Sequence, residues 1–163
     1  MGIRATFLWM ACAIAALAVG VGLYVVDRPA VHVYLLPPAL TLPGAPVWVS
    51  GVLGGSLPSF LHVFAFTLFT AAVLTPRTAR SAAAITVAWC ATDVLFELAQ
   101  HPLLAPRIAA ALPDWIGGIP LLDNIGPYFL RGTFDPADIA AIVVGAAFAY
   151  LTIRWTNKLG GVS

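Results

Sequence analysis

The sequence predicts an all-α protein, a polytopic transmembrane helical bundle that forms a single domain over residues 1–163. Of these residues, 61% are hydrophobic and only 9% are charged, whereas a soluble domain typically carries about 25% charged residues. A small domain also leaves much of its surface exposed, so a chain this apolar is better suited to lipid than to water. We expect about four spanning helices and two irregular outer-side loops, with the spans near residues 6–26, 58–74, 82–99 and 136–153.

The first span, residues 6–26, is an unbroken apolar stretch. At a rise of 1.5 Å per residue, roughly 21 residues cover the ~30 Å hydrocarbon core of a bilayer. A signal peptide has a shorter apolar region of about 7–15 residues, so this stretch predicts a membrane anchor. Trp9 lies near its start, a position typical of an aromatic residue at the membrane interface.

The second span, residues 58–74, follows a segment that is rich in proline and glycine yet mostly apolar. This segment, residues 27–57, is predicted to lie on the membrane surface or to dip into the membrane against the helices, where irregular backbone is tolerated. Pro58 suits the first position of the second helix, or the helix begins earlier and is kinked there.

The third span, residues 82–99, is followed by the second outer loop, which contains an apolar run from Leu103 to Leu112. This run predicts a short interfacial helix that starts near Pro106.

The fourth span, residues 136–153, begins with the residues expected of a helix start. Asp135 suits the N-cap and Pro136 suits the first helical position. Asp138 falls in the first turn, near the positive end of the helix dipole.

The basic residues predict the orientation of the chain. One side of the membrane would carry five of them and no acidic residue: Arg4, Arg77, Arg80, Arg154 and Lys158. The opposite side would carry acidic and basic residues together. The positive-inside rule therefore places both termini in the cytoplasm.

Ionisable residues inside the spans are the candidates for function, because such groups are costly in lipid and normally have a partner or a role. Asp93 and Glu97 are four residues apart, as are Glu97 and His101, so the three share one helical face. With this topology, His62 is expected about one turn below the outer surface and Asp93 nearly two turns below it. The predicted outer-face polar cluster has these members: His62, Asp93, Glu97, Gln100, Arg131 and Asp138.

Each member of the cluster also has a structural interpretation. His62 is as well explained by a hydrogen bond to another helix, and Asp138 by the helix start described above. Glu97 is expected to need a partner such as His62 or Arg131. Asp93 is expected to be protonated or to bond Thr67, Thr70 or His62.

Three motifs resemble the VanZ-like family of small bacterial membrane proteins. The stretches are Ser59-Phe-Leu-His-Val-Phe-Ala-Phe66, Leu95-Phe-Glu-Leu-Ala-Gln100 and Gly132-Thr-Phe-Asp-Pro-Ala-Asp-Ile139, the last followed by Gly145. The chain departs from the family at two places. It has Leu57, Pro58 and Ser59 where the family usually has an Asp-Lys pair, and Ile142 where the family tends to have Asn.

The resemblance implies a multi-pass protein of the bacterial inner membrane, within the cell envelope, and an association with resistance to glycopeptide antibiotics. The polar cluster would then bind an amphiphilic or lipid-linked ligand, with Arg131 pairing an anionic head group.

An alternative function stays open beside it. In that interpretation the chain is a small non-catalytic accessory subunit that packs into a larger membrane complex, possibly pigment- or haem-associated through His62. Small residues along the fourth span favour this alternative, because they suit close helix packing: Ala137, Ala140, Ala141, Gly145, Ala146, Ala147 and Ala149. A transporter is the least favoured function, since four spans without an internal repeat are few for one.

The sequence points to no catalytic site, and we lean towards a function without catalysis. It lacks a nucleotide-binding loop and a Ser-His-Asp arrangement. The two cysteines, Cys12 and Cys90, lie inside apolar stretches and suggest neither a metal site nor a disulfide. We therefore expect no metal and no cofactor. The expected partners are membrane lipids and possibly other membrane-protein subunits, and a net charge of +1 gives no reason to expect nucleic acid.

Overall fold

The computed structural model describes residues 3–27, 52–119, 122 and 125–159. Within these ranges the chain is helical and has no strand, which confirms the predicted fold class. Its elements are α1 (Ile3–Asp27), α2 (Val52–Leu74), α3 (Ala79–Ala99), α4 (Ala105–Ala111), the 3-10 helix η3 (Asp114–Gly118), α5 (Ile125–Arg131) and α6 (Pro136–Leu159). Four of these helices are long and apolar enough to cross a membrane, with candidate spans Ala5–Leu23, Gly55–Leu74, Ala79–Ala99 and Pro136–Leu159. The chain thus has the architecture of a multi-pass membrane protein.

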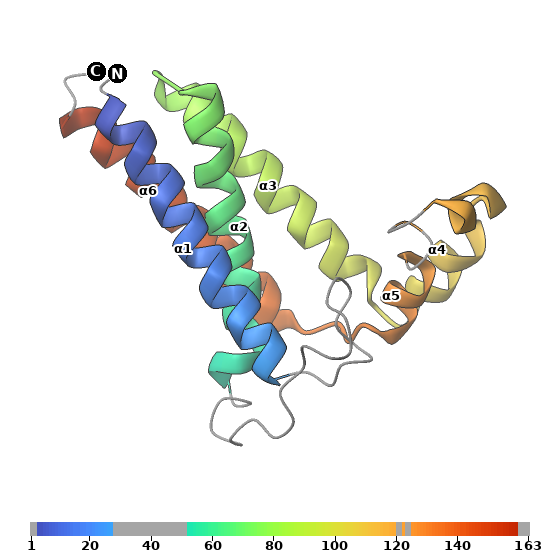
Figure 1. The fold of residues 1–163 in the computed structure, drawn as a ribbon. Helices are drawn as coiled ribbons and strands as arrows, with labels where there is room; N and C mark the ends of the chain where they lie inside the picture. The colour runs from blue at the N-terminus through green and yellow to red at the C-terminus, as the bar shows by residue number, and fades with distance from the viewer. Residues whose placement is uncertain (1–2, 28–51, 120–121, 123–124, 160–163) are drawn as a thin grey trace.

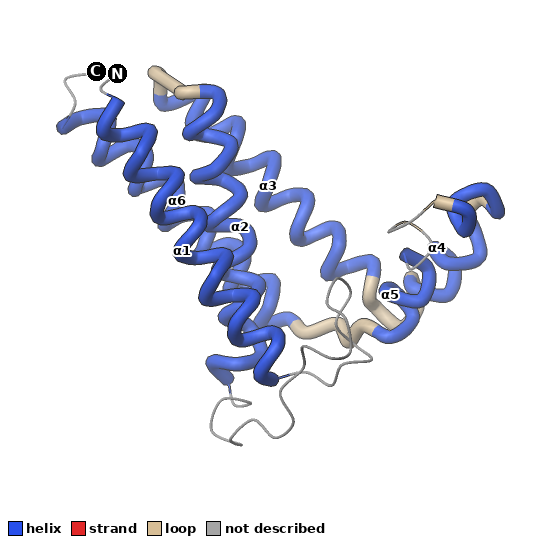
Figure 2. Tube along the Cα trace, in the orientation of Figure 1, coloured by secondary structure: helices blue, strands red, loops and turns tan. Residues whose placement is uncertain are grey.

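The four long helices run alternately up and down and define two ends of the bundle (Figure 1). The start of α1, the turn between α2 and α3 and the end of α6 lie together at one end, which we call the terminus end. The opposite end carries α4, η3 and α5, which extend sideways beyond α3. We call residues 103–119, 122 and 125–131 the arm and this end the arm end. Short loops join the arm to α3 and α6 (Figure 2).

Helix α2 is the centre of the bundle, since it packs against α1, α3 and α6. The larger part of the core includes Leu68 of α2, Ala13 of α1 and Ile153 of α6, all fully buried. A smaller part nearer the arm end joins Val63 to Ile142 and Ala146 of α6. Many core residues are small, so the helices meet with their backbones close together.

Gly145 marks a close approach of α2 and α6. A Cβ atom at this position would lie 2.6 Å from the carbonyl oxygen of Phe60 and 2.7 Å from Cγ1 of Val63. The small residues at the centre of α6, including the buried Ala146 and Ala149, therefore pack against helices of the same chain. Ala140 and Ala147 lie on the exposed side of α6.

The helix ends differ from several of the expected boundaries, and α1 begins at Ile3, three residues before the expected start. Helix α2 begins at Val52, so Pro58 lies inside the helix and not at its first position. Helix α3 begins at Ala79, where the side chain of Thr78 accepts a hydrogen bond from the N–H of Ser81 and forms a capping box with it. The fourth span continues past residue 153 to Leu159, as the polar last turn of α6 stays helical.

Two hydrogen bonds join segments far apart in the sequence at the terminus end. Trp9 Nε1 donates to Thr156 Oγ1 at 2.8 Å, and Asn157 Nδ2 donates to the carbonyl oxygen of Pro76 at 2.9 Å. Trp9 is fully buried, so its indole faces the bundle and not lipid, while its depth near the membrane interface stays a prediction. Its indole is buried against α6 because the N–H finds a partner there.

The two predicted loops have different outcomes. Of the first, expected over residues 27–57, residues 28–51 lie outside the described residues and residues 52–57 form the start of α2. The second contains the predicted short helix as α4, which starts one residue before Pro106, and it also contains η3 and α5, which were not predicted.

The packing at Gly145 gives a test of the fold. We expect Gly145→Val to lower the thermal unfolding temperature in detergent, and Gly145→Ala to do so by less. Overpacking costs about 1–3 kcal/mol, while replacing glycine by alanine in a helix returns up to about 1 kcal/mol. Ala147→Val is the matched control, since Ala147 is exposed on the same helix. Equal unfolding temperatures for Gly145→Val and the control would contradict the close contact.

Candidate functional site

One face of α3 carries the polar residues of the candidate site. Asp93, Glu97 and Gln100 follow one another at intervals of about one helical turn. The two carboxyl-bearing residues are buried, with 9% and 6% of their surface exposed. Each of the three contacts a different element of the fold, so this face connects α3 to α2, α5 and the start of α6.

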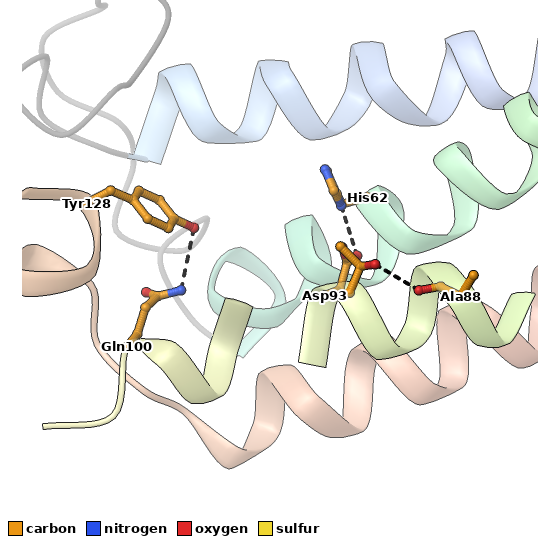
Figure 3. A network of polar contacts seen from close by, with 6 residues as sticks. His62, Ala88, Asp93, Gln100 and Tyr128 are labelled. Atoms are coloured by element: carbon orange, nitrogen blue, oxygen red, sulfur yellow. Dashed lines mark hydrogen bonds and ion pairs between the residues drawn. The ribbon is translucent and has the colours of Figure 1, made fainter. Parts of the chain in front are cut away.

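The deepest contact joins α3 to α2. His62 Nδ1 lies 2.9 Å from Asp93 Oδ2 (Figure 3). At 1.5 Å per residue, His62 lies about 10 Å from Gly55 at the start of its span, and Asp93 lies about 9 Å from Ala99 at the end of its own. The pair therefore lies about a third of the way into the apolar region, so His62 is deeper than the single turn that was expected. Of the three partners expected for Asp93, His62 is the one that it contacts.

Aromatic side chains surround the imidazole on one side. The ring centroids of His62 and Phe66 are 4.4 Å apart, and those of Phe66 and Trp89 are 4.8 Å apart. Trp89 Nε1 donates a hydrogen bond to Thr70 Oγ1 at 2.9 Å. Thr70, the second partner expected for Asp93, therefore bonds Trp89. The third, Thr67, is fully buried.

The contact with Asp93 occupies one nitrogen of the imidazole, and which atom donates in it depends on the tautomer of His62. The second ring nitrogen, Nε2, is left for another partner. Figure 3 shows the second ring nitrogen pointing away from Asp93. About half of the His62 side chain, 49%, is accessible at the surface of the bundle. Nε2 has no hydrogen-bond partner within the part of the chain that the structure describes.

The second contact joins the end of α3 to the start of α6. Glu97 Oε1 accepts a hydrogen bond from the backbone N–H of Asp135 at 2.7 Å. Asp135 Oδ1 accepts from the N–H of Ala137 at 2.8 Å, which is the expected N-cap contact. The Glu97 carboxyl group thus lies at the positive end of the α6 dipole, where a negative charge is stabilised. This explains how a buried acidic residue is held at the end of α3.

The third contact joins α3 to the arm. Gln100 Nε2 lies 3.5 Å from the hydroxyl oxygen of Tyr128 on α5 and 3.4 Å from the carbonyl oxygen of Phe96 (Figure 3). Gly132 follows α5 and packs directly on the Gln100 side chain, so a Cβ atom there would overlap it.

The remaining predicted residues are arranged differently from the expected cluster. Arg131 is exposed at the end of α5. Asp138 lies in the first turn of α6, and its Oδ1 atom is buried with no hydrogen-bond partner among the described residues. His101 lies beyond the end of α3, where Nδ1 accepts from the N–H of Leu103 at 3.2 Å, so it does not continue the polar face. His62 was one of two partners expected for Glu97, but it contacts Asp93 instead.

Tyr128 and Gly132 are the site residues that sequence reasoning missed. The signal for Gly132 was its place at the start of the third motif, directly before the loop that leads into α6. Tyr128 carried no signal, since one tyrosine in an apolar loop is usually an interfacial residue.

The described residues contain no group of three or more His, Cys, Asp or Glu side chains placed to hold a metal ion. The chemistry that the site offers is hydrogen bonding and proton transfer at His62, next to a buried carboxylate.

Comparisons of the chain with protein-family models, with curated proteins and with solved structures found no match.

The His62–Asp93 contact predicts that the two side chains are energetically coupled. We expect Asp93→Ala and His62→Ala each to lower the free energy of unfolding in detergent. The double variant is expected to lose less than the sum of the two single losses. The expected coupling energy is about 0.6 kcal/mol and at most about 1.7 kcal/mol, the range that double-mutant cycles give for hydrogen bonds between membrane helices. Thr92→Ala is the control, because Thr92 bonds the backbone of its own helix. Additive losses would contradict the contact.

The Glu97 contact predicts that Glu97→Gln and Glu97→Ala differ in stability. Glu97→Gln keeps an oxygen that accepts from the Asp135 N–H and is expected to retain most of the stability. Glu97→Ala leaves that N–H without its partner and is expected to cost about 1–3 kcal/mol. Thermal unfolding of the two variants measures the difference, and equal losses would contradict the role given to the hydrogen bond.

Proposed function

We propose that this chain is a VanZ-like integral membrane protein of the bacterial inner membrane, and that it binds an amphiphilic, lipid-linked ligand near its arm end. The observation that carries the proposal is the His62–Asp93 pair. A buried carboxylate orients the imidazole, while Nε2 has no partner in the described chain and half of the side chain is accessible.

A purely structural role explains this arrangement less well. A hydrogen bond that only joins two helices needs one donor and one acceptor, whereas His62 keeps a second polar atom at the surface of an apolar span. A polar group without a partner is costly in hydrocarbon, where no water replaces the missing bond. A ligand that forms a hydrogen bond with Nε2 would remove this cost. Its apolar part would lie against the aromatic residues beside His62 and against lipid.

The distribution of charge supports the orientation that this function needs. Arg77, Arg80, Arg154 and Lys158 lie at the terminus end, on the α2–α3 turn and the end of α6. Acidic and basic residues are mixed at the arm end, as with Asp114 and Arg107. By the positive-inside rule, the terminus end faces the cytoplasm with both termini, and the arm end faces outward. A lipid-linked molecule of the cell envelope then has direct access to the arm end.

The alternative, an accessory subunit of a larger complex, has less support. The buried small residues of α6 that favoured it pack against α2 in the same chain, as at Gly145. This alternative predicts a protein partner in constant ratio after purification from native membranes, which the proposed function does not need.

Ligand binding tests the proposal directly. The whole chain would be placed in nanodiscs of phosphatidylethanolamine and phosphatidylglycerol and titrated with a polyprenyl diphosphate and with a lipoglycopeptide, with bound ligand counted by native mass spectrometry. We expect saturable binding of at least one probe and a loss of affinity of about tenfold in His62→Ala, equivalent to about 1.4 kcal/mol. Thr92→Ala, one residue from Asp93 but outside the pair, should bind as the unmodified chain does.

Two results would overturn the proposal. One is that neither probe binds saturably. The other is that folded His62→Ala binds as tightly as the control. His62→Gln, which keeps a hydrogen-bonding side chain of similar size, separates loss of the imidazole from loss of packing.

A further inference from the structure

We infer that the arm is a lipid-binding surface, which lies in the head-group region of the bilayer at the arm end and contacts the membrane directly. This inference is independent of any ligand at His62. It rests on where the arm is held, on which side chains it exposes, and on its continuity with the lipid-facing surface of α3.

The position of the arm is defined by its attachments. It leaves the bundle where α3 ends and α6 begins, and it extends sideways instead of along the bundle axis (Figure 1). The rings of Phe96 and Phe129 lie 5.7 Å apart and connect α5 to the last turns of α3. The contact of Gln100 with Tyr128 adds a polar attachment at the same level. Since α3 crosses the apolar region up to Ala99, the arm is held at the edge of that region.

The arm has a small interior of its own. Helices α4 and α5 pack against each other, with Ala105 and Phe129 buried. A Cβ atom on Gly126 of α5 would be in ordinary contact with Leu112, which follows α4. The arm is therefore a packed unit, and several of its large apolar side chains are left exposed.

These outward side chains are unsuited to water. Six large apolar residues of the arm are exposed: Leu103, Leu104, Trp115, Ile119, Leu122 and Leu130. Exposed apolar residues gathered in so short a segment mark a surface that contacts lipid or protein. Lipid is favoured because the adjoining Leu95 and Phe96 of α3 are also exposed within a membrane-spanning helix, so the apolar surface continues from the span onto the arm.

The polar residues of the arm suit the same location. Trp115 is 65% exposed, and tryptophan is enriched at the level of the head groups. Arg107 and Arg131 are exposed as well. At the head-group level, the aliphatic stem of an arginine lies along apolar surroundings while its guanidinium binds phosphate oxygens, so both residues suit this location.

Fluorescence quenching by brominated lipids tests the inference. The whole chain is placed in nanodiscs whose phosphatidylcholine is brominated either near the head group or near the chain ends, and the emission of Trp115 is obtained as the difference between the unmodified chain and Trp115→Phe. We expect a clear loss of Trp115 emission with both lipids, larger for bromine near the head group. The emission of Trp155, obtained in the same way from Trp155→Phe, is the control, because this residue is 68% exposed on α6.

The possible results show whether lipid, water or a protein partner contacts this surface. Quenching of Trp155 without quenching of Trp115 overturns the inference. Quenching of Trp115 by aqueous iodide would then show water at the arm, and protection from iodide would show a protein partner. Leu103→Trp in the Trp115→Phe background gives a second reporter on the arm, which we expect to be quenched by the same lipids.

Discussion

Hydrogen bonds between α3 and its neighbours govern the arm end of this molecule, because a missing partner is costly inside an apolar span, where no water replaces it. Asp93, Glu97 and Gln100 lie on one face of α3, and each is bound to a different element. These contacts hold three elements in place relative to α3: helix α2, the start of α6 and the arm. If α3 rotated by half a turn, buried carboxyl groups would face lipid, so the polar face defines the orientation of the helix as well as its neighbours.

The two ends of the bundle are held together by different means. At the terminus end, small residues allow close packing, and the bonds from Trp9 to Thr156 and from Asn157 to Pro76 join α1, α6 and the α2–α3 turn. Towards the arm end, α3 diverges from α1 and α2 (Figure 1), and the His62–Asp93 hydrogen bond joins α3 to α2 there, while α2 and α6 stay in close contact at Gly145. A site with an accessible imidazole is consistent with the second arrangement, since a tightly packed core leaves no polar atom open to a ligand.

The number of long helices and the position of most spans followed from the sequence because apolar length is a direct consequence of bilayer thickness. The cap at Asp135 was predictable for a similar reason, since its contacts are local. The start of α2 was not, because a proline is tolerated inside a membrane helix when neighbouring helices support it. The partners of His62, Glu97 and Gln100 were harder still. They depend on how each helix is rotated about its axis, and a periodicity shows which residues share a face but not which helix that face meets.

The contacts of α6 with α2 and α1 have a consequence for biosynthesis. Val63 of α2 packs against Ile142 and Ala146 of α6, and Trp9 bonds a threonine only a few residues from the end of that helix. Because α6 is translated after the other three long helices, they enter the membrane with their future contact surfaces still facing lipid or the insertion machinery. Assembly of the core is therefore a late event, and a chain released before α6 is complete would display an indole and a bare α2 surface by which quality-control proteases can recognise it.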